Sequence, residues 1–143
     1  MTDITIHEGE QKDFLKAFED EQWPLADKQH YGERMPNFSI NKYTILAQEG
    51  DKIIGYMYLE TDMGVAKVNS LLVHNEFQRK GIASALMKKA EEKAKTEGCH
   101  ILTVETGKEW GAKEFYESQG FTTIANLKEY YGKNDFVLME KRI

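Results

Sequence analysis

One stretch of the chain decides the fold: Ser70-Leu71-Leu72-Val73-His74-Asn75-Glu76-Phe77-Gln78-Arg79-Lys80-Gly81-Ile82-Ala83. An apolar strand stops at Val73, a short polar loop follows, and a helix starts near Gly81. The first N–H groups of a helix are unpaired and lie at the positive end of its dipole, so they favour phosphate. Gly81 lets a diphosphate approach closely, and Arg79 and Lys80 add positive charge. The stretch therefore predicts a pyrophosphate site.

The segments around this stretch predict a mixed α/β domain. Apolar runs typical of strands lie at 43–48, 53–59, 65–73, 101–104, 121–124 and 136–140. Amphipathic runs typical of helices lie at 81–96 and 110–119. The first three strands read as an antiparallel meander, and the later strands alternate with the two helices. We therefore expect a sheet with helices on its faces.

The N-terminal quarter predicts further elements. Residues 4–6 are a candidate first strand, and residues 10–21 repeat apolar side chains at helical spacing. Pro24 is suited to the first turn of a second short helix that runs towards Tyr31. Residues 32–42 contain glycine, proline and asparagine and read as a loop.

Composition limits the class of protein. The 143 residues suit one domain, 1–143, and a net charge of −5 disfavours nucleic acid as a partner. No apolar stretch is long enough to span a membrane, so we expect no membrane partner. Cys99 is the only cysteine, which excludes an internal disulfide and Cys-cluster metal sites and suits a cytoplasmic protein. The histidines show no metal-ligand spacing, and we predict no metal.

The decisive stretch also resembles a known family. Residues 78–83, Gln-Arg-Lys-Gly-Ile-Ala, resemble the acetyl-CoA signature of the GNAT (N-acetyltransferase) superfamily: Gln or Arg, two residues, Gly, one residue, then Gly or Ala. Residues 114–121, Glu-Phe-Tyr-Glu-Ser-Gln-Gly-Phe, look like the family's fourth-helix motif. The resemblance covers residues 65–141 well and the N-terminal half only in element order. Competing P-loop and dinucleotide-binding glycine motifs are not found in the sequence.

The resemblance implies a fold and a cofactor. The fold is α/β (α+β), with a mixed, mostly antiparallel central sheet of six or seven strands flanked by about four helices. Acetyl-CoA is the acyl donor and would lie at the splayed central strands, where strand 71–73 would pair with the pantetheine arm. The cofactor-binding residues implied are Leu72, Val73, Gln78, Arg79, Lys80, Gly81, Ile82, Ala83 and Ser84.

Tyr116 is the predicted catalytic residue. The resemblance implies that it lies near the thioester sulfur, and a phenol with a pKa near 10 stays protonated at neutral pH and can donate to that sulfur. The other interpretation is a core tyrosine on an apolar helix face. Cys99 is not expected to form a covalent intermediate, because no histidine is placed to activate it.

A general base is harder to assign. In the histone-modifying branch a glutamate on the central strand fills this role, and the matching position here is Lys67, which cannot replace it when charged. Glu60 and Glu105 are substitutes at strand ends, although each also reads as an ordinary solvated carboxylate. His74 follows a strand and reads as structural.

The function predicted is transfer of an acetyl group from acetyl-CoA to a primary amine of a small molecule or peptide by direct attack. The alternative is a non-catalytic acyl-CoA-binding sensor or interaction module. The resemblance implies that the acceptor binds at the first helices and their loop, here about residues 23–38. Trp23, Tyr31 and Glu33 are therefore candidates for the acceptor site. Homodimers are also common among proteins of this resemblance.

Overall fold

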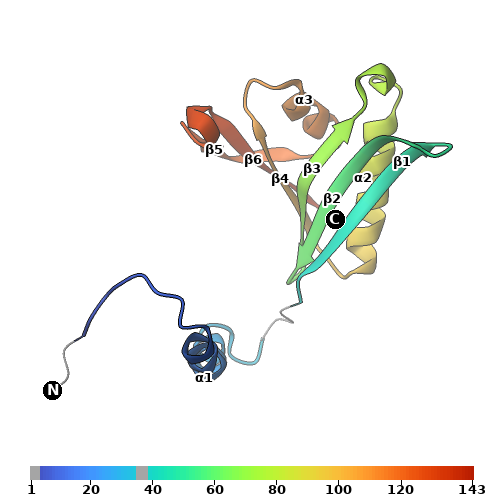
Figure 1. The fold of residues 1–143 in the computed structure, drawn as a ribbon. Helices are drawn as coiled ribbons and strands as arrows, with labels where there is room; N and C mark the ends of the chain where they lie inside the picture. Colours follow the sequence, from blue (N-terminus) through green and yellow to red (C-terminus); the bar gives the residue numbers. More distant parts are fainter. Residues whose placement is uncertain (1–3, 35–38) are drawn as a thin grey trace. The chain divides into compact units, whose positions relative to one another are not determined.

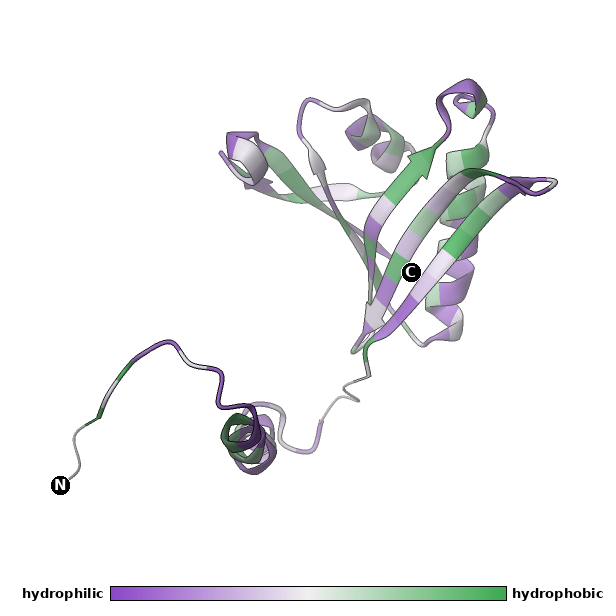
Figure 2. Cartoon of the chain, viewed as in Figure 1, coloured by the Kyte–Doolittle hydropathy of each residue, from purple (hydrophilic) through white to green (hydrophobic). Residues whose placement is uncertain are grey.

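The computed structural model describes residues 4–34 and 39–143. The chain divides into two compact units, Met1–Asn37 and Phe38–Ile143 (Figure 1). In the described part of the first unit there is one helix, α1 (Lys12–Tyr31), whose large apolar side chains are solvent-exposed, among them Phe14 and Phe18. Figure 2 shows that hydrophobic and polar residues lie on different sides of α1, as the spacing predicts.

Two expectations for the first unit are wrong. Residues 4–6 form no strand, because a strand needs a hydrogen-bonded neighbour and no described residue pairs with them. Pro24 does not open a separate helix but lies inside α1. Its ring nitrogen cannot donate to the carbonyl of Asp20, so the continuous helix forgoes one backbone hydrogen bond there.

The second unit contains the sheet. The strands are β1 (Asn41–Glu49), β2 (Lys52–Asp62), β3 (Val65–Val73), β4 (Ile101–Gly107), β5 (Thr122–Leu127) and β6 (Phe136–Arg142). Their spatial order is β1-β2-β3-β4-β6-β5, and only β3 and β4 are parallel. The described residues also form three α-helices and two 3-10 turns, η1 (Asn75–Phe77) and η2 (Tyr131–Lys133). The predicted mixed, mostly antiparallel sheet is confirmed.

Helix α2 (Ile82–Thr96) covers the β1–β3 part of one sheet face, and α3 (Gly111–Ser118) lies beside β4 (Figure 1). The apolar stripe of α2 explains this packing, since Leu86, Met87, Ala90 and Ala94 are all buried in the core. Gly55 on β2 lets the helix start come close, because a Cβ there would be 3.3 Å from Ile82 Cγ2. The helix therefore begins directly beside the end of β3.

Gly98 follows the last turn of α2 in the left-handed conformation that glycine favours, with a φ of 78°. Cys99 then turns into β4 and is buried in the same core. On the far side, Lys141 Nζ lies 2.8 Å from Glu91 Oε2 and ties β6 to α2. Because this pair is three-quarters buried, the attraction is less screened than on the surface.

Candidate active site

Strands β3 and β4 separate halfway along their length. Val65–Val68 pair with Ile101–Val104, but β3 continues to Val73 and β4 to Gly107 without further pairing. The backbone groups of β3 that face β4 beyond this point have no ladder partner among the described residues. A wedge of this kind can accept an extended ligand as a substitute strand. The sequence-based expectation of a splayed central strand is confirmed.

A β-bulge coincides with the point of separation. On β2, Tyr58 pairs with Ser70 and Leu59 with Val68, so Asn69 is an extra residue on β3. Beyond the bulge, Leu71 and Val73 pack against the core on the α2 side of the sheet. By the two-residue alternation of a strand, Ser70 and Leu72 face the opposite side.

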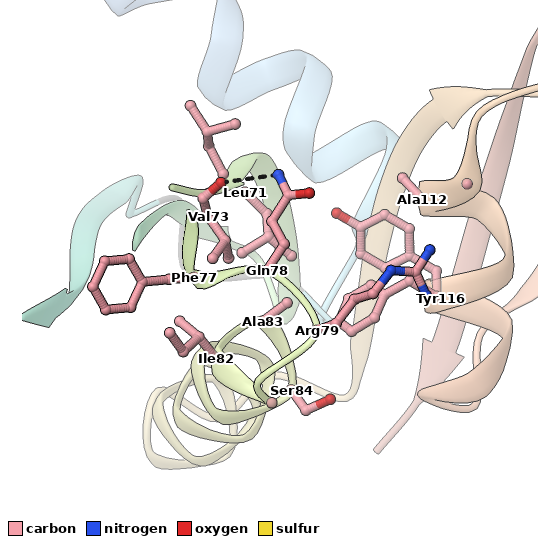
Figure 3. Close-up of a pocket in the computed structure, with 14 residues that line it drawn as sticks. Leu71, Val73, Phe77, Gln78, Arg79, Ile82, Ala83, Ser84, Ala112 and Tyr116 are labelled. Atoms are coloured by element: carbon pink, nitrogen blue, oxygen red, sulfur yellow. Dashed lines mark hydrogen bonds between the residues drawn. The ribbon is translucent and has the colours of Figure 1, made fainter. Parts of the chain in front are cut away.

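A cavity of about 500 Å³ lies where the wedge opens. It is formed by the end of β3, the following loop, the first turn of α2 and one side of α3 (Figure 3). Its lining residues are Leu71, Leu72, Val73, Phe77, Gln78, Arg79, Gly81, Ile82, Ala83, Ser84, Gly111, Ala112, Phe115 and Tyr116. The structure thus brings together eight of the nine predicted cofactor-binding residues with Tyr116, and their roles stay predictions.

The start of α2 supplies free donors to this cavity. Gly81 has a φ of 80° and caps the helix, and the first intrahelical bond runs from Ala85 N to Gly81 O at 3.0 Å. No described side chain caps the helix, and its first turn holds no acidic residue. The N–H groups of the first turn, which Ile82, Ala83 and Ser84 carry, are therefore available to an anion.

The two basic residues of the signature behave differently. Arg79 lines the cavity and takes a left-handed φ of 59°, which orients the loop before Gly81. The Lys80 ammonium lies 5.2 Å from the centre of the Phe77 ring. Lys80 is thus the one predicted cofactor residue that does not line the cavity, because its side chain packs on an aromatic face instead.

Gln78 holds the loop against the strand. Its Nε2 donates to the carbonyl oxygen of Val73 at 3.3 Å, the bond drawn in Figure 3. His74 caps η1, since its Nδ1 accepts from the N–H of Glu76 at 3.1 Å and its ring meets Phe77 edge-on. The structural interpretation of His74 fits this geometry.

Sequence reasoning missed part of the cavity wall. Gly111 and Ala112 begin α3 and line the cavity, and Phe115 lines it one turn later. The small residues Gly111 and Ala112 at the start of a helix could have indicated that another group comes close to the backbone there. No local pattern could have shown which face of α3 meets the wedge, because that depends on how β4 leads into the helix.

Tyr116 combines burial with access to the cavity. Its side chain is only 5% exposed and packs edge-on against Phe115 and Phe121, at 5.3 and 5.4 Å. Its hydroxyl is directed into the cavity (Figure 3). Burial raises the pKa of Tyr116 to about 12, because the phenolate would lose hydration. The phenol therefore remains a hydrogen-bond donor across the neutral range.

The structure separates the two carboxylates considered as bases. Glu60 lies opposite Lys67 on β3, and its Oε2 accepts from Asn69 Nδ2 at 3.4 Å, so it is already engaged. Glu105 follows Val104, the last β4 residue that pairs with β3, and is half-buried on the sheet face opposite α2. Only Glu105 is thus placed at the apex of the wedge.

Ser70 lies on β3 at the same apex. Its Oγ is buried and has no hydrogen-bond partner among the described residues. A buried hydroxyl without a partner is costly, so it marks a place where a bound molecule would restore the missing bond.

Other predicted features fall outside the cavity. The described residues hold no group of three or more His, Cys, Asp or Glu side chains arranged for a metal. In the same residues, no helix is both long and apolar enough to cross a membrane. Trp23, Tyr31 and Glu33 lie in the first unit, and their acceptor role stays a prediction. Residues 35–38 of that segment are outside the described residues.

A sequence model of the acetyltransferase (GNAT) domain matches residues 7–143. This chain belongs to the GNAT acetyltransferase family. GCN5-related N-acetyltransferase 4, chloroplastic, of Arabidopsis thaliana is 40% identical over 62 residues, 43% of this chain. The match spans about a fifth (21%) of the length of that curated relative.

Solved structures show the same fold. An acetyltransferase from Bacillus cereus superposes with a TM-score of 0.77 at 17% identity over 98% of both chains. The ribosomal-protein-S18-alanine N-acetyltransferase from Escherichia coli gives 0.66 at 22% identity, over 97% of this chain and 93% of that one. A GNAT family acetyltransferase from Elizabethkingia anophelis with acetyl-CoA bound gives 0.67 at 19% identity, covering 87% and 84%. At these identities the likeness concerns the fold alone.

Proposed function

We propose that this protein transfers the acetyl group of acetyl-CoA to a primary amine of a small molecule or peptide. The observation that carries the proposal is the juxtaposition of an unpaired strand end, a free helix start and a buried phenol around one cavity. Each suits a different part of the donor: the strand the pantetheine amides, the helix the diphosphate, and Tyr116 the thioester sulfur. The neighbour with acetyl-CoA bound supports this donor.

The chemistry is direct attack. A neutral amine adds to the thioester carbonyl, and the oxyanion that forms is stabilised by strand N–H groups such as that of Val73. The new C–N bond persists while the C–S bond breaks, and one proton must move from nitrogen to sulfur. Tyr116, as general acid, donates a proton towards the leaving sulfur and recovers one from the nitrogen. The single free cysteine suits a reducing compartment, and we place the reaction in the cytoplasm.

Thiol release from acetyl-CoA, measured over a panel of amines, amino acids, aminoglycosides and peptides, tests the transfer. Turnover well above hydrolysis with one class is expected. In the Tyr116→Phe variant kcat should fall by about 100-fold while acetyl-CoA affinity changes little. Phenylalanine keeps the ring packing, so a folded variant is expected.

Lys67 in place of a strand carboxylate favours a second function, acyl-CoA binding without turnover. This function predicts a blank amine panel together with a raised melting temperature in acetyl-CoA. A blank panel without any thermal shift would contradict both functions.

A further inference from the structure

A group of aromatic side chains lies beside the apex of the wedge, outside the described cavity wall. The rings of Tyr130 and Tyr131 are stacked at 4.5 Å with an interplanar angle of 6°. Phe136 meets Tyr131 edge-on at 5.1 Å and Trp110 at 5.2 Å. Phe136 is buried, whereas Tyr130 and Tyr131 are exposed. The two tyrosines therefore pack on the buried Phe136 and expose part of their ring surfaces to solvent.

The turn that carries the tyrosines is internally braced. The N–H of Tyr130 donates to the carbonyl of Asn134 at 2.8 Å. Asp135 accepts twice: its Oδ1 from the N–H of Glu129 at 2.9 Å, and its carbonyl from the N–H of Lys108 at 3.0 Å. These bonds tie the η2 turn to the residue that follows β4. The rings are thus held in position rather than carried on a loose loop.

Glu105 is the charged neighbour of this group. It lies on β4 on the sheet face opposite α2, two residues before Gly107. A Cβ on Gly107 would collide with the indole of Trp110, which shows that the indole covers this part of the same face. The negative charge of Glu105 raises the pKa of Tyr131. Glu105 pairs with Leu138 and Gly107 with Phe136, so Phe136 is a neighbour of Glu105 on the same sheet face, and Tyr131 packs against Phe136.

In the described part of the chain, no Lys or Arg forms an ion pair with Glu105 or lies over the ring of Tyr130 or Tyr131. The ion pairs found there do not include Glu105. The lysines that lie over aromatic rings do so at Phe77 and Tyr43, not at Tyr130 or Tyr131. A half-buried carboxylate beside electron-rich ring faces has the chemistry of a site for an organic cation.

We propose that Glu105, Tyr130 and Tyr131 bind a protonated or quaternary nitrogen of the acceptor. This inference rests on the proposed acetyl transfer and names its substrate class. The nitrogen that attacks a thioester must be neutral, whereas the nitrogen held by Glu105 is charged. In this proposal the nitrogen held by Glu105 stays charged, and a second basic nitrogen of the acceptor attacks: one nitrogen anchors the molecule and the other reacts.

Choline and its uncharged isostere 3,3-dimethylbutan-1-ol test the site without turnover. Titration of the full chain, with coenzyme A present, should show choline binding about tenfold more tightly than the isostere. Glu105→Gln and Tyr131→Leu should each remove most of this difference. Tyr131→Phe keeps the aromatic ring and should therefore keep the difference in affinity between choline and its isostere. Glu92→Gln, on the exposed face of α2, removes a charge elsewhere on the protein and is the control. Equal binding of the two ligands by the unaltered protein would overturn the proposal.

Turnover measurements distinguish the proposed cation site from the proposed acetyl transfer. Hexane-1,6-diamine and hexylamine share a reacting end and differ in the second nitrogen. We expect kcat/KM to favour the diamine by about tenfold, and Glu105→Gln and Tyr131→Leu each to reduce that preference. Equal rates for the two amines would leave acetyl transfer standing and overturn the cation site. Selective choline binding with no transfer to any amine would do the reverse.

Discussion

Gln119 and Ser84 are joined by a hydrogen bond across the cavity, with Gln119 Nε2 donating to Ser84 Oγ at 3.1 Å. Gln119 is the C-cap of α3, and Ser84 belongs to the first turn of α2. The bond therefore sets the spacing between the two helices that line the cavity. It also occupies the Ser84 side chain, so we predict that Ser84 contributes its backbone N–H to phosphate binding.

Loss of this bond should weaken donor binding more than folding. In Gln119→Ala we expect the KM for acetyl-CoA to rise about threefold to fivefold, since a partly exposed hydrogen bond is worth about 1 kcal/mol. Steady-state kinetics and thermal unfolding measure the two effects. Ser84→Ala should match it, and the double variant should add nothing further. Gln48→Ala, an exposed glutamine on β1, is the control, and additive effects at residues 84 and 119 would contradict the linkage.

Gly81→Ala tests the helix start against a matched glycine. Gly81 and Gly98 have φ values of 80° and 78°, and an added Cβ would meet nothing within 4 Å at either position. Each alanine should therefore cost a similar unfolding free energy, roughly 1–2 kcal/mol, from the left-handed conformation alone. Only Gly81→Ala should also weaken acetyl-CoA binding, by about tenfold. Equal affinities in calorimetry would show that the diphosphate does not approach Gly81.

The pKa of Tyr116 predicts a dependence of stability on alkaline pH. Burial raises it to about 12, above the value near 10 of an unfolded chain. The neutral phenol is the form that the fold favours, so its contribution is complete below about pH 10 and is lost as the pH rises towards 12. Urea unfolding at about pH 8 and about pH 11.5 should show the parent losing on the order of 2 kcal/mol more than Tyr116→Phe. Equal losses would mean that the ring is not buried in solution.

Cys99→Ala tests direct attack. Burial raises the pKa of the Cys99 thiol, with a smaller contribution from the charge of Glu97, and both make it a poor nucleophile. The variant should keep kcat within about twofold, because the thiol takes no part in acyl transfer. An acetylated Cys99 peptide in mass spectrometry, or loss of turnover without loss of fold, would instead support a covalent intermediate.

Much of the second unit was readable from the sequence because its signals are local. Strand β3 has the predicted bounds of Val65–Val73, and the apolar stripe of α2 follows from helical spacing. Other strands run further than their apolar runs: β4 continues to Gly107 because Glu105 and Thr106 keep pairing with β6. Polar residues in such a ladder carry no apolar signal, so their strand state depends on the neighbouring strand.

Other parts of the site could not be predicted, because they depend on contacts between residues that are far apart in the sequence. The bond between Gln119 and Ser84 spans 35 residues, and the stacking of Tyr130 and Tyr131 beside Glu105 needs β4, β6 and the η2 turn together. The contact of Lys80 with the Phe77 ring could not be predicted for a similar reason, since Phe77 lies in a 3-10 turn within the segment predicted as a loop.

The extra residue at Asn69 has a consequence for how β3 and β4 are kept apart. On β2, Leu59 pairs with Val68 and Tyr58 with Ser70, so deletion of Asn69 would leave both pairs in place and remove only the bulge. Leu71 and Val73 would keep their side of the strand and their contact with the core. A regular β3 would then be free to continue its pairing with β4 beyond Val68, where the pairing now stops, and so to close the wedge. One inserted residue thus acts as a spacer that holds two strands of the same sheet apart.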